Sequence, residues 1–291
     1  MERGQAPGSA GGGGRGAGSL MVEEQNLAAL GVRRITIDTG PDELVLPPET
    51  RQRLDLVTDW LRHPPFIFRE WGLSRYVDGG FRALFRGASG TGKTMAAVTL
   101  AKSAAADLFY VDLAGVLSEF VGETEKQLKS LFAAAADSGA ILLFDEADAL
   151  LGKRNEIRDA NDRYADSGIA QLLRRIEPFE GLAIITTNRP GQIDEQALGR
   201  IDVIVDFPLP DEAAREAIWR RLLDAVKLPR SEALDFQMLA THPLSGAEIL
   251  RCVRMATLMA AAQHCEIGME HLKFAAAERL AMRSAGQGLT G

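Results

Sequence analysis

The eight residues Gly87-Ala88-Ser89-Gly90-Thr91-Gly92-Lys93-Thr94 constrain the fold more than any other stretch of this 291-residue chain. They fit the pattern G-x-x-x-x-G-K-[ST] at every defined position. Residues 81–85 before them read as a buried strand, and residues 95–101 after them read as the first turns of a helix. Glycines let backbone N–H groups turn toward an anion, and a helix N-terminus adds positive potential. The pattern therefore predicts a phosphate-binding loop, with Lys93 on the outer phosphates and the Thr94 hydroxyl on magnesium.

Further apolar runs predict the sheet that carries this loop. They cover residues 108–112, 140–144, 182–187 and 203–207. The run at 140–144 has no polar interruption, as is typical of a central parallel strand. Helix-like segments alternate with these runs, so we expect an α/β fold of the P-loop NTPase type, with a five-stranded parallel sheet flanked by helices. Residues 34–37 suggest one more short strand.

Polar residues follow two of the predicted strands. Asp145 and Glu146 end the strand at 140–144, and Asn188 ends the strand at 182–187. Open α/β sheets bind ligands at the carboxyl ends of their strands. We expect Asp145 in the magnesium shell and Glu146 as the general base that activates water; acids that merely face solvent are the alternative. Asn188 is expected to hold that water or sense the terminal phosphate, or else to cap the next turn.

The sequence after residue 210 changes to helical patterns. Ser245-Gly246-Ala247-Glu248 forms a capping box that opens a long helix, and other helices are expected near 213–226 and 269–282. We read this part as a small helical lid. The predicted organisation is a disordered Gly/Ala-rich tail at 1–20, a short segment at 21–43, a large α/β domain at 44–210, the lid at 211–283 and a flexible tail at 284–291. Translation from Met21 is an alternative to Met1, which the mass of the native protein would decide.

Composition narrows the classes of partner. The net charge is 33 − 40 = −7, which makes nucleic-acid binding unlikely. Two cysteines, Cys252 and Cys265, predict free thiols rather than a disulfide framework. No apolar run reaches the length of a membrane span, and the four histidines show no ligand spacing. We therefore expect a cytoplasmic protein. The phosphate loop and Thr94 predict a nucleotide and Mg²⁺ as its cofactors.

Two aromatic features allow more than one interpretation. Phe120-Val121-Gly122 reads as an exposed aromatic loop, or as a staple that packs on the helix starting near Thr124. Trp60 and Trp71 precede the phosphate loop, and either core packing or one wall of an adenine pocket explains them.

These elements together resemble an AAA ATPase in the narrow sense over about residues 44–283. The ordered set is the phosphate loop, Phe120-Val121-Gly122, Asp145-Glu146, Asn188, Gly199-Arg200-Ile201-Asp202 and the capping box at Ser245. The resemblance implies a hexameric ring with ATP at the subunit interfaces and a protein substrate in the central pore. It makes Arg200 the arginine finger inserted into the neighbouring site, and it makes Phe120 and Val121 the pore-lining grip. It also places Ala247 near the adenosine.

One position departs from that pattern. Many relatives carry a second arginine three residues after the first, and Val203 stands there in this chain. The finger function therefore rests on Arg200, and a single arginine suffices in other phosphoryl-transfer enzymes.

A narrower resemblance concerns residues 152–165, 71–73 and 207–211. These segments are similar to bacterial AAA ATPases encoded beside contractile injection particles that look like phage tails. The leading hypothesis is a magnesium-dependent ATPase that remodels or unfolds a protein, and the narrower resemblance suggests the assembly or disassembly of such a particle as its setting. The alternative is an ATP-gated assembly scaffold with little turnover, against which Glu146 argues because a pure binder needs no general base.

Overall fold

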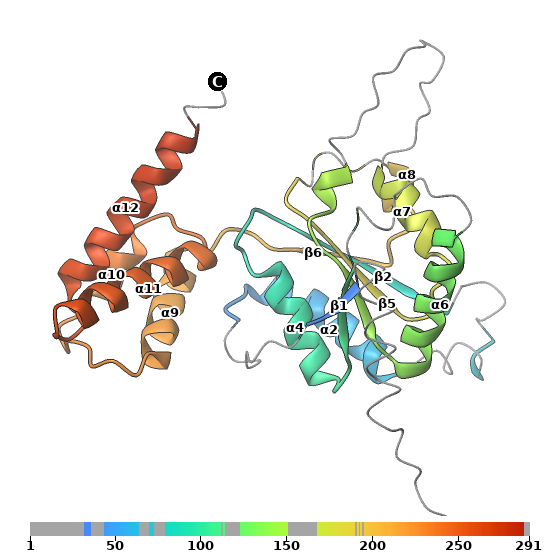
Figure 1. The fold of residues 1–291 in the computed structure, drawn as a ribbon, viewed down its shortest axis with the longest axis horizontal. Coiled ribbons are helices and arrows are strands. Elements are labelled where there is room, and N and C mark those ends of the chain that lie inside the picture. The colour runs from blue at the N-terminus through green and yellow to red at the C-terminus, as the bar shows by residue number, and fades with distance from the viewer. Residues whose placement is uncertain are drawn as a thin grey trace, which may run out of the picture.

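The computed structural model divides the chain into an α/β unit and a C-terminal helical unit joined by the segment at 207–211 (Figure 1). It describes residues 32–35, 44–63, 70–72, 79–111, 113, 123–150, 168–189, 191, 193 and 195–287. The predicted loop Phe120-Val121-Gly122 lies outside these residues, as do residues 152–165.

A six-stranded sheet forms the centre of the α/β unit. Its spatial order is β1 (Val32–Arg34), β3 (Leu108–Val111), β4 (Ile141–Phe144), β5 (Leu182–Thr187), β2 (Phe81–Arg86) and β6 (Val203–Asp206). The last five are parallel to one another, as predicted, and β1 adds an antiparallel edge strand. The short strand expected at 34–37 thus occupies 32–34 instead.

Helices cover both faces of this sheet. The α-helices are α2 (Pro48–Arg62), α4 (Lys93–Ser103), α6 (Glu123–Ser138), α7 (Gly168–Ile176) and α8 (Glu195–Leu198), with a 3₁₀ turn η3 (Ala147–Leu150) after β4. Helices α2 and α4 pack with Ile141 and Leu143 on one face. Helices α6, α7 and α8 pack with Leu142 and Phe144 on the other (Figure 1). Successive β4 residues serve opposite faces, which explains why the strand is apolar throughout.

The C-terminal helices build a separate core. They are α9 (Glu212–Ala225), α10 (Phe236–Ala240), α11 (Gly246–Ala262) and α12 (Met269–Gln287), and their buried side chains surround Trp219 and Ile249. The predicted capping box is confirmed: Glu248 N–H donates to Ser245 Oγ at 3.4 Å, and Ser245 N–H donates to the Glu248 carboxylate at 2.8 Å. None of the helices in the described part of the chain combines the length and the apolar character that a bilayer crossing requires.

Candidate nucleotide-binding site

The loop between β2 and α4 runs so close to other segments that two of its positions exclude a side chain. A Cβ on Gly87 would lie 2.1 Å from the Phe207 carbonyl oxygen. Gly90 has a left-handed φ of +78°, and its Cβ would lie 2.8 Å from the side chains of Ser245 and Ala247. The glycines therefore let the backbone of this loop fit between β6 and the start of α11.

Lys93 is the first residue of α4, and its side chain is buried beneath the loop. Its Nζ donates hydrogen bonds of 2.8 Å each to the carbonyl oxygens of Gly87 and Ala88 and to Asn188 Oδ1. Burial lowers the pKa of Lys93, and the negative charges of Asp145, Asp148 and Glu146 oppose that shift. The geometry brings Lys93 and Asn188 together from elements 95 residues apart.

Thr94 and Asp145 supply neighbouring oxygen ligands. Thr94 Oγ1 donates to the Asp145 carboxylate, at 2.9 Å from Oδ2 and 3.2 Å from Oδ1. Thr186, on β5, also donates its hydroxyl hydrogen to Asp145. A hydroxyl and a carboxylate beside a phosphate-binding loop are the hard oxygen donors that Mg²⁺ prefers, so these residues fit the expected ion.

Glu146 follows Asp145 with a strained backbone and an exposed side chain. Its φ is +55°, in the left-handed region that few residues other than glycine adopt. Its N–H donates to Thr186 Oγ1 at 3.0 Å, which holds that conformation. Glu146 lines the pocket described below, so its carboxylate is available to a molecule bound there.

Asp148 is a site residue that the sequence analysis missed. Its carboxylate accepts hydrogen bonds from the backbone N–H of Asn188, at 2.9 and 3.0 Å, and of Arg189, at 3.2 Å. It also accepts the hydroxyl hydrogen of Thr187. Asp148 therefore fixes the turn that carries Asn188. A third acid closing the run Asp145-Glu146-Ala147-Asp148 was the available signal, but its partners are about forty residues away.

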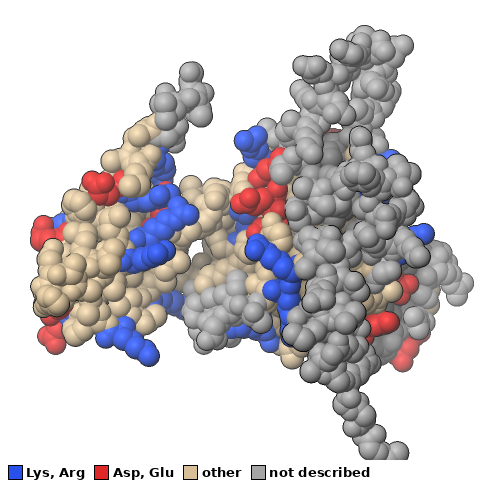
Figure 2. All heavy atoms as spheres, viewed as in Figure 1, with Lys and Arg blue, Asp and Glu red and all other residues tan. Residues whose placement is uncertain are grey.

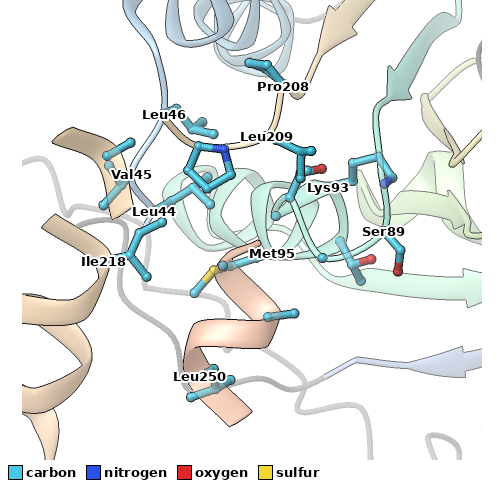
Figure 3. A pocket seen from close by; sticks show the side chains of 18 of the residues that line it. Leu44, Val45, Leu46, Ser89, Lys93, Met95, Pro208, Leu209, Ile218 and Leu250 are labelled. Carbon is cyan, nitrogen blue, oxygen red and sulfur yellow. The ribbon is translucent and has the colours of Figure 1, made fainter. Parts of the chain in front are cut away.

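A pocket of about 750 Å³ opens beside the loop. Its polar end contains the loop, with Ser89 and Lys93, and its apolar end contains Leu44, Val45 and Ile218 (Figure 3). The remaining wall comes from 208–211 and from the start of α11. This pairing of a polar end with an apolar end suits a nucleotide, because phosphates and a base need opposite environments.

The adenine-pocket hypothesis for the two tryptophans is not supported by this geometry. Trp60 stacks on Phe81, with 5.5 Å between ring centroids, and Trp71 is 72% exposed. Neither residue lines the pocket. The segment at 44–48 supplies that wall instead.

The helical unit reaches the pocket through α9 and α11. The Ala247 N–H donates to the Gly90 carbonyl oxygen at 3.1 Å, and Ala247 and Arg221 both line the pocket. Lys and Arg side chains gather on the side of the helical unit that is turned toward the α/β unit (Figure 2). Such a surface attracts anionic ligands even though the whole chain is acidic.

Arg200 lies apart from these residues, at the end of the sheet where strands β2 and β6 begin. Strands β2 and β6 are parallel, with Ala83 opposite Val203. The phosphate loop follows the end of β2, whereas Arg200 precedes the start of β6. At about 3.3 Å per residue, β2 is roughly 20 Å long, so about this distance separates the start of the strands, near Arg200, from their end, near the phosphate loop. Arg200 forms an ion pair with Glu177 and does not line the pocket.

A mostly parallel sheet with a glycine loop between β2 and α4, and with acids at the end of β4, defines a P-loop nucleoside triphosphatase. Residues 83–209 match the family described as "ATPase family associated with various cellular activities (AAA)". The match covers less than half of the chain, and over residues 83–209 the chain is similar to AAA ATPases. This similarity supports the predicted enzyme class, an ATP hydrolase.

Curated relatives agree with the family. The chain is 33% identical over 216 residues to the human "ATPase family gene 2 protein homolog A", which covers 72% of this chain and 24% of the relative. It is 30% identical to the "26S proteasome subunit RPT4" of Saccharomyces cerevisiae, over 61% of this chain and 42% of the relative. It is 32% identical to the "Proteasome-activating nucleotidase" of Saccharolobus solfataricus, over 72% and 54%. The chain thus spans between about a quarter and a half of these relatives.

Proposed function

We propose that the chain is a magnesium-dependent cytoplasmic ATPase that assembles into a ring. The ring grips a protein in its central pore and uses ATP hydrolysis to remodel or unfold that protein. The position of Arg200 is the observation that carries this proposal. Arg200 lies at the end of the sheet away from its own phosphate loop, and the distance between them is longer than an arginine side chain. An arginine finger at that end of the sheet acts in a neighbouring subunit.

The roles within one subunit follow from the contacts of the loop. The backbone of residues 87–92 and Lys93 hold the phosphates of ATP, and Thr94 and Asp145 hold Mg²⁺. The ion, when bound, offsets negative charge on the phosphates. Glu146 takes the proton of the attacking water. Asn188, held by Asp148, orients that water or contacts the terminal phosphate.

The helical unit is proposed to work as a lid, with the large domain at 44–210 and the lid at 211–283. Its separate core allows it to move as one body. The hydrogen bond from Ala247 to Gly90 connects it directly to the loop that holds the phosphates. A change in nucleotide state therefore has a physical route to the lid, and Ala247 is the residue nearest that route.

The protein substrate is assigned to Phe120 and Val121, on the sequence resemblance. Two relatives carry the word proteasome in their names, which agrees with a protein substrate. The variant Phe120→Ala is expected to keep basal ATP turnover and to lose substrate processing. Unchanged processing would assign Phe120 to packing only.

A comparison of wild type with Glu146→Gln separates the enzyme from the scaffold hypothesis. Both proteins are expected to bind ATP, because Glu146 does not hold the phosphates. Turnover is expected to fall by about a hundredfold or more, the usual contribution of a general base. Equal, slow rates in the two proteins would favour the ATP-gated scaffold.

We further propose that the partner belongs to a contractile injection particle, on the resemblance of residues 152–165, 71–73 and 207–211. The Glu146→Gln protein, which holds ATP, serves as a trap. Pull-down from cells that produce such a particle is expected to recover its components, and the double variant Glu146→Gln, Phe120→Ala is the control. Recovery of unrelated proteins would reject this partner.

A further inference from the structure

Arg82 is a buried arginine with no role in the phosphate loop. It is the second residue of β2 and is 8% exposed. Its Nη2 donates to the Glu177 carbonyl oxygen at 2.6 Å. Glu177 directly follows α7, where helix carbonyls lack backbone partners, so a cation there satisfies an acceptor and opposes the negative end of the helix dipole.

The backbone of Arg82 holds a second segment. Its N–H donates to Asp202 Oδ2 at 2.7 Å, and the Asp202 N–H donates to the Arg82 carbonyl oxygen at 2.9 Å. Burial raises the pKa of Asp202, while the hydrogen bond and the charge of Arg82 oppose that shift. Asp202 is two residues after Arg200. Arg82 is thus bonded both to Glu177, which precedes Arg200 in the chain, and to Asp202, which follows it.

The two segments meet at Arg200. Glu177, whose carbonyl is held by Arg82, forms the ion pair with the Arg200 guanidinium. Both side chains of that pair are about two-fifths exposed, at 38% and 42%. An exposed pair of this kind contributes little to stability, so Arg200 can exchange Glu177 for a stronger anion such as a phosphate.

Tight packing shows that the site is built around the Arg82 side chain. A Cβ on Gly80 would lie 2.2 Å from the Phe179 carbonyl oxygen and 2.9 Å from Arg82 Nη1. The segment at 177–181 therefore lies directly against β2, and the glycine leaves room for the guanidinium. Lysine could not replace this geometry, because it lacks the planar fork of donors.

From these contacts we infer that Arg82 is a positioning residue that fixes Glu177 and Asp202 so that Arg200 is presented to the neighbouring subunit. This inference rests on the proposed function, because it requires Arg200 to act across an interface. Strand β2 then serves two sites: its carboxyl end leads into the subunit's own phosphate loop, and Arg82 at its other end supports the next site in the ring.

Mixed rings provide the test. Arg82→Met retains the aliphatic stem and removes the guanidinium; alone, it is expected to bind ATP normally and to lose about tenfold or more in turnover, as misplaced catalytic groups do. Glu146→Gln alone is inactive but presents an intact Arg200. In an equal mixture, half of the subunits have a competent pocket and half of their neighbours have a well-placed finger, so turnover is expected to recover to roughly a quarter of wild type.

Two control arms separate the possible causes. The mixture of Arg200→Ala with Glu146→Gln tests the finger itself; if that mixture stays inactive, the proposed function fails. If it recovers while the Arg82→Met mixture does not, only the role of Arg82 is overturned. Arg53→Met is the matched variant, because Arg53, on α2, also donates to a backbone carbonyl oxygen, that of Ile204 at 3.0 Å rather than that of Glu177. It is expected to keep wild-type turnover.

The folded state of Arg82→Met is checked by thermal unfolding and by binding of a fluorescent ATP analogue. If that variant does not fold, Arg82→Lys takes its place, since it keeps the buried charge. The Arg82→Lys protein is expected to show reduced turnover alone and recovery in the mixture. Wild-type turnover of Arg82→Lys alone, or no recovery in the mixture, would overturn the inference.

Discussion

Among the residues that the structure describes, two buried cationic side chains lie near opposite ends of strand β2 and are held in different ways. Lys93 is surrounded by the carbonyls of its own loop and by Asn188. Arg82 is bonded to Glu177 and Asp202, which are 95 and 120 residues away. In the proposed ring, the first cation faces the nucleotide of its own subunit, and the second supports Arg200, which is directed at another subunit. If the proposed ring forms, strand β2 connects two nucleotide sites, one at each of its ends.

The largest expected effect is that of removing the Arg200 side chain, which we propose acts in the neighbouring subunit. Arg200→Ala should lower ring-dependent turnover on the order of a thousandfold, the usual contribution of an arginine finger. ATP affinity should stay within about twofold, because Arg200 does not line its own pocket. Steady-state turnover and equilibrium binding measure the two quantities separately. Unchanged turnover would place the finger at another residue.

The next largest effect is that of removing the Lys93 amine, which lies beneath the subunit's own phosphate loop. Lys93→Met should lower turnover by about a hundredfold or more, because a buried donor to the phosphates is lost. Unlike Arg82→Met, it should also weaken ATP binding, which titration with a fluorescent analogue measures. Mixing it with Glu146→Gln should give no recovery, since each protein then has a defective pocket. Recovery in that mixture would show that Lys93 acts across the interface.

A smaller effect sharpens the role of Asp148. Asp148→Asn removes a charge that accepts hydrogen bonds from the turn at Asn188, and hydrogen bonds to charged groups contribute about 1.5–3 kcal/mol. Turnover should therefore fall about tenfold while ATP affinity changes little. Asp137→Asn, on the exposed surface of α6, is the matched control. A larger loss of binding than of turnover would make Asp148 part of the binding surface.

The smallest expected effect concerns pH. Burial lowers the pKa of Lys93 from 10.5, so below 10.5 the unfolded chain binds more protons at this residue than the folded chain does. The contribution of Lys93 to the free energy of unfolding should therefore rise as pH approaches 10.5. Denaturant titrations of the nucleotide-free protein at stepped pH measure this slope. Lys93→Met should reduce it, whereas the exposed-residue variant Lys102→Met should not; equal slopes in all three proteins would contradict the lowered pKa.

The sequence predicted what short-range patterns encode. The loop and its flanking strand and helix have fixed local spacing, and the apolar run before Asp145 marks β4 without any knowledge of its neighbours. The capping box at Ser245 was equally local and is confirmed. These features depend on backbone geometry within a few residues, which a single sequence displays directly.

The missed features depend on contacts between distant segments. Asp148 looked like one more acid until its bonds to the Asn188 turn were visible. Arg82 carried no sequence signal of its own within the buried strand at 81–85, because its partners Glu177 and Asp202 come from the segments that follow α7 and α8. The pocket wall at 44–48 had no sequence signal that distinguished it from a linker. Register and packing between elements decide these roles, and neither is written in local patterns.

The most direct test of shared sites is the turnover of the wild-type chain as it is diluted, with the oligomeric state measured in the same samples. At saturating ATP and Mg²⁺, turnover per subunit should fall steeply as rings dissociate, because each site loses the guanidinium of its neighbour. Full turnover per subunit in samples that contain only monomers would contradict the account and leave a self-sufficient nucleotide hydrolase.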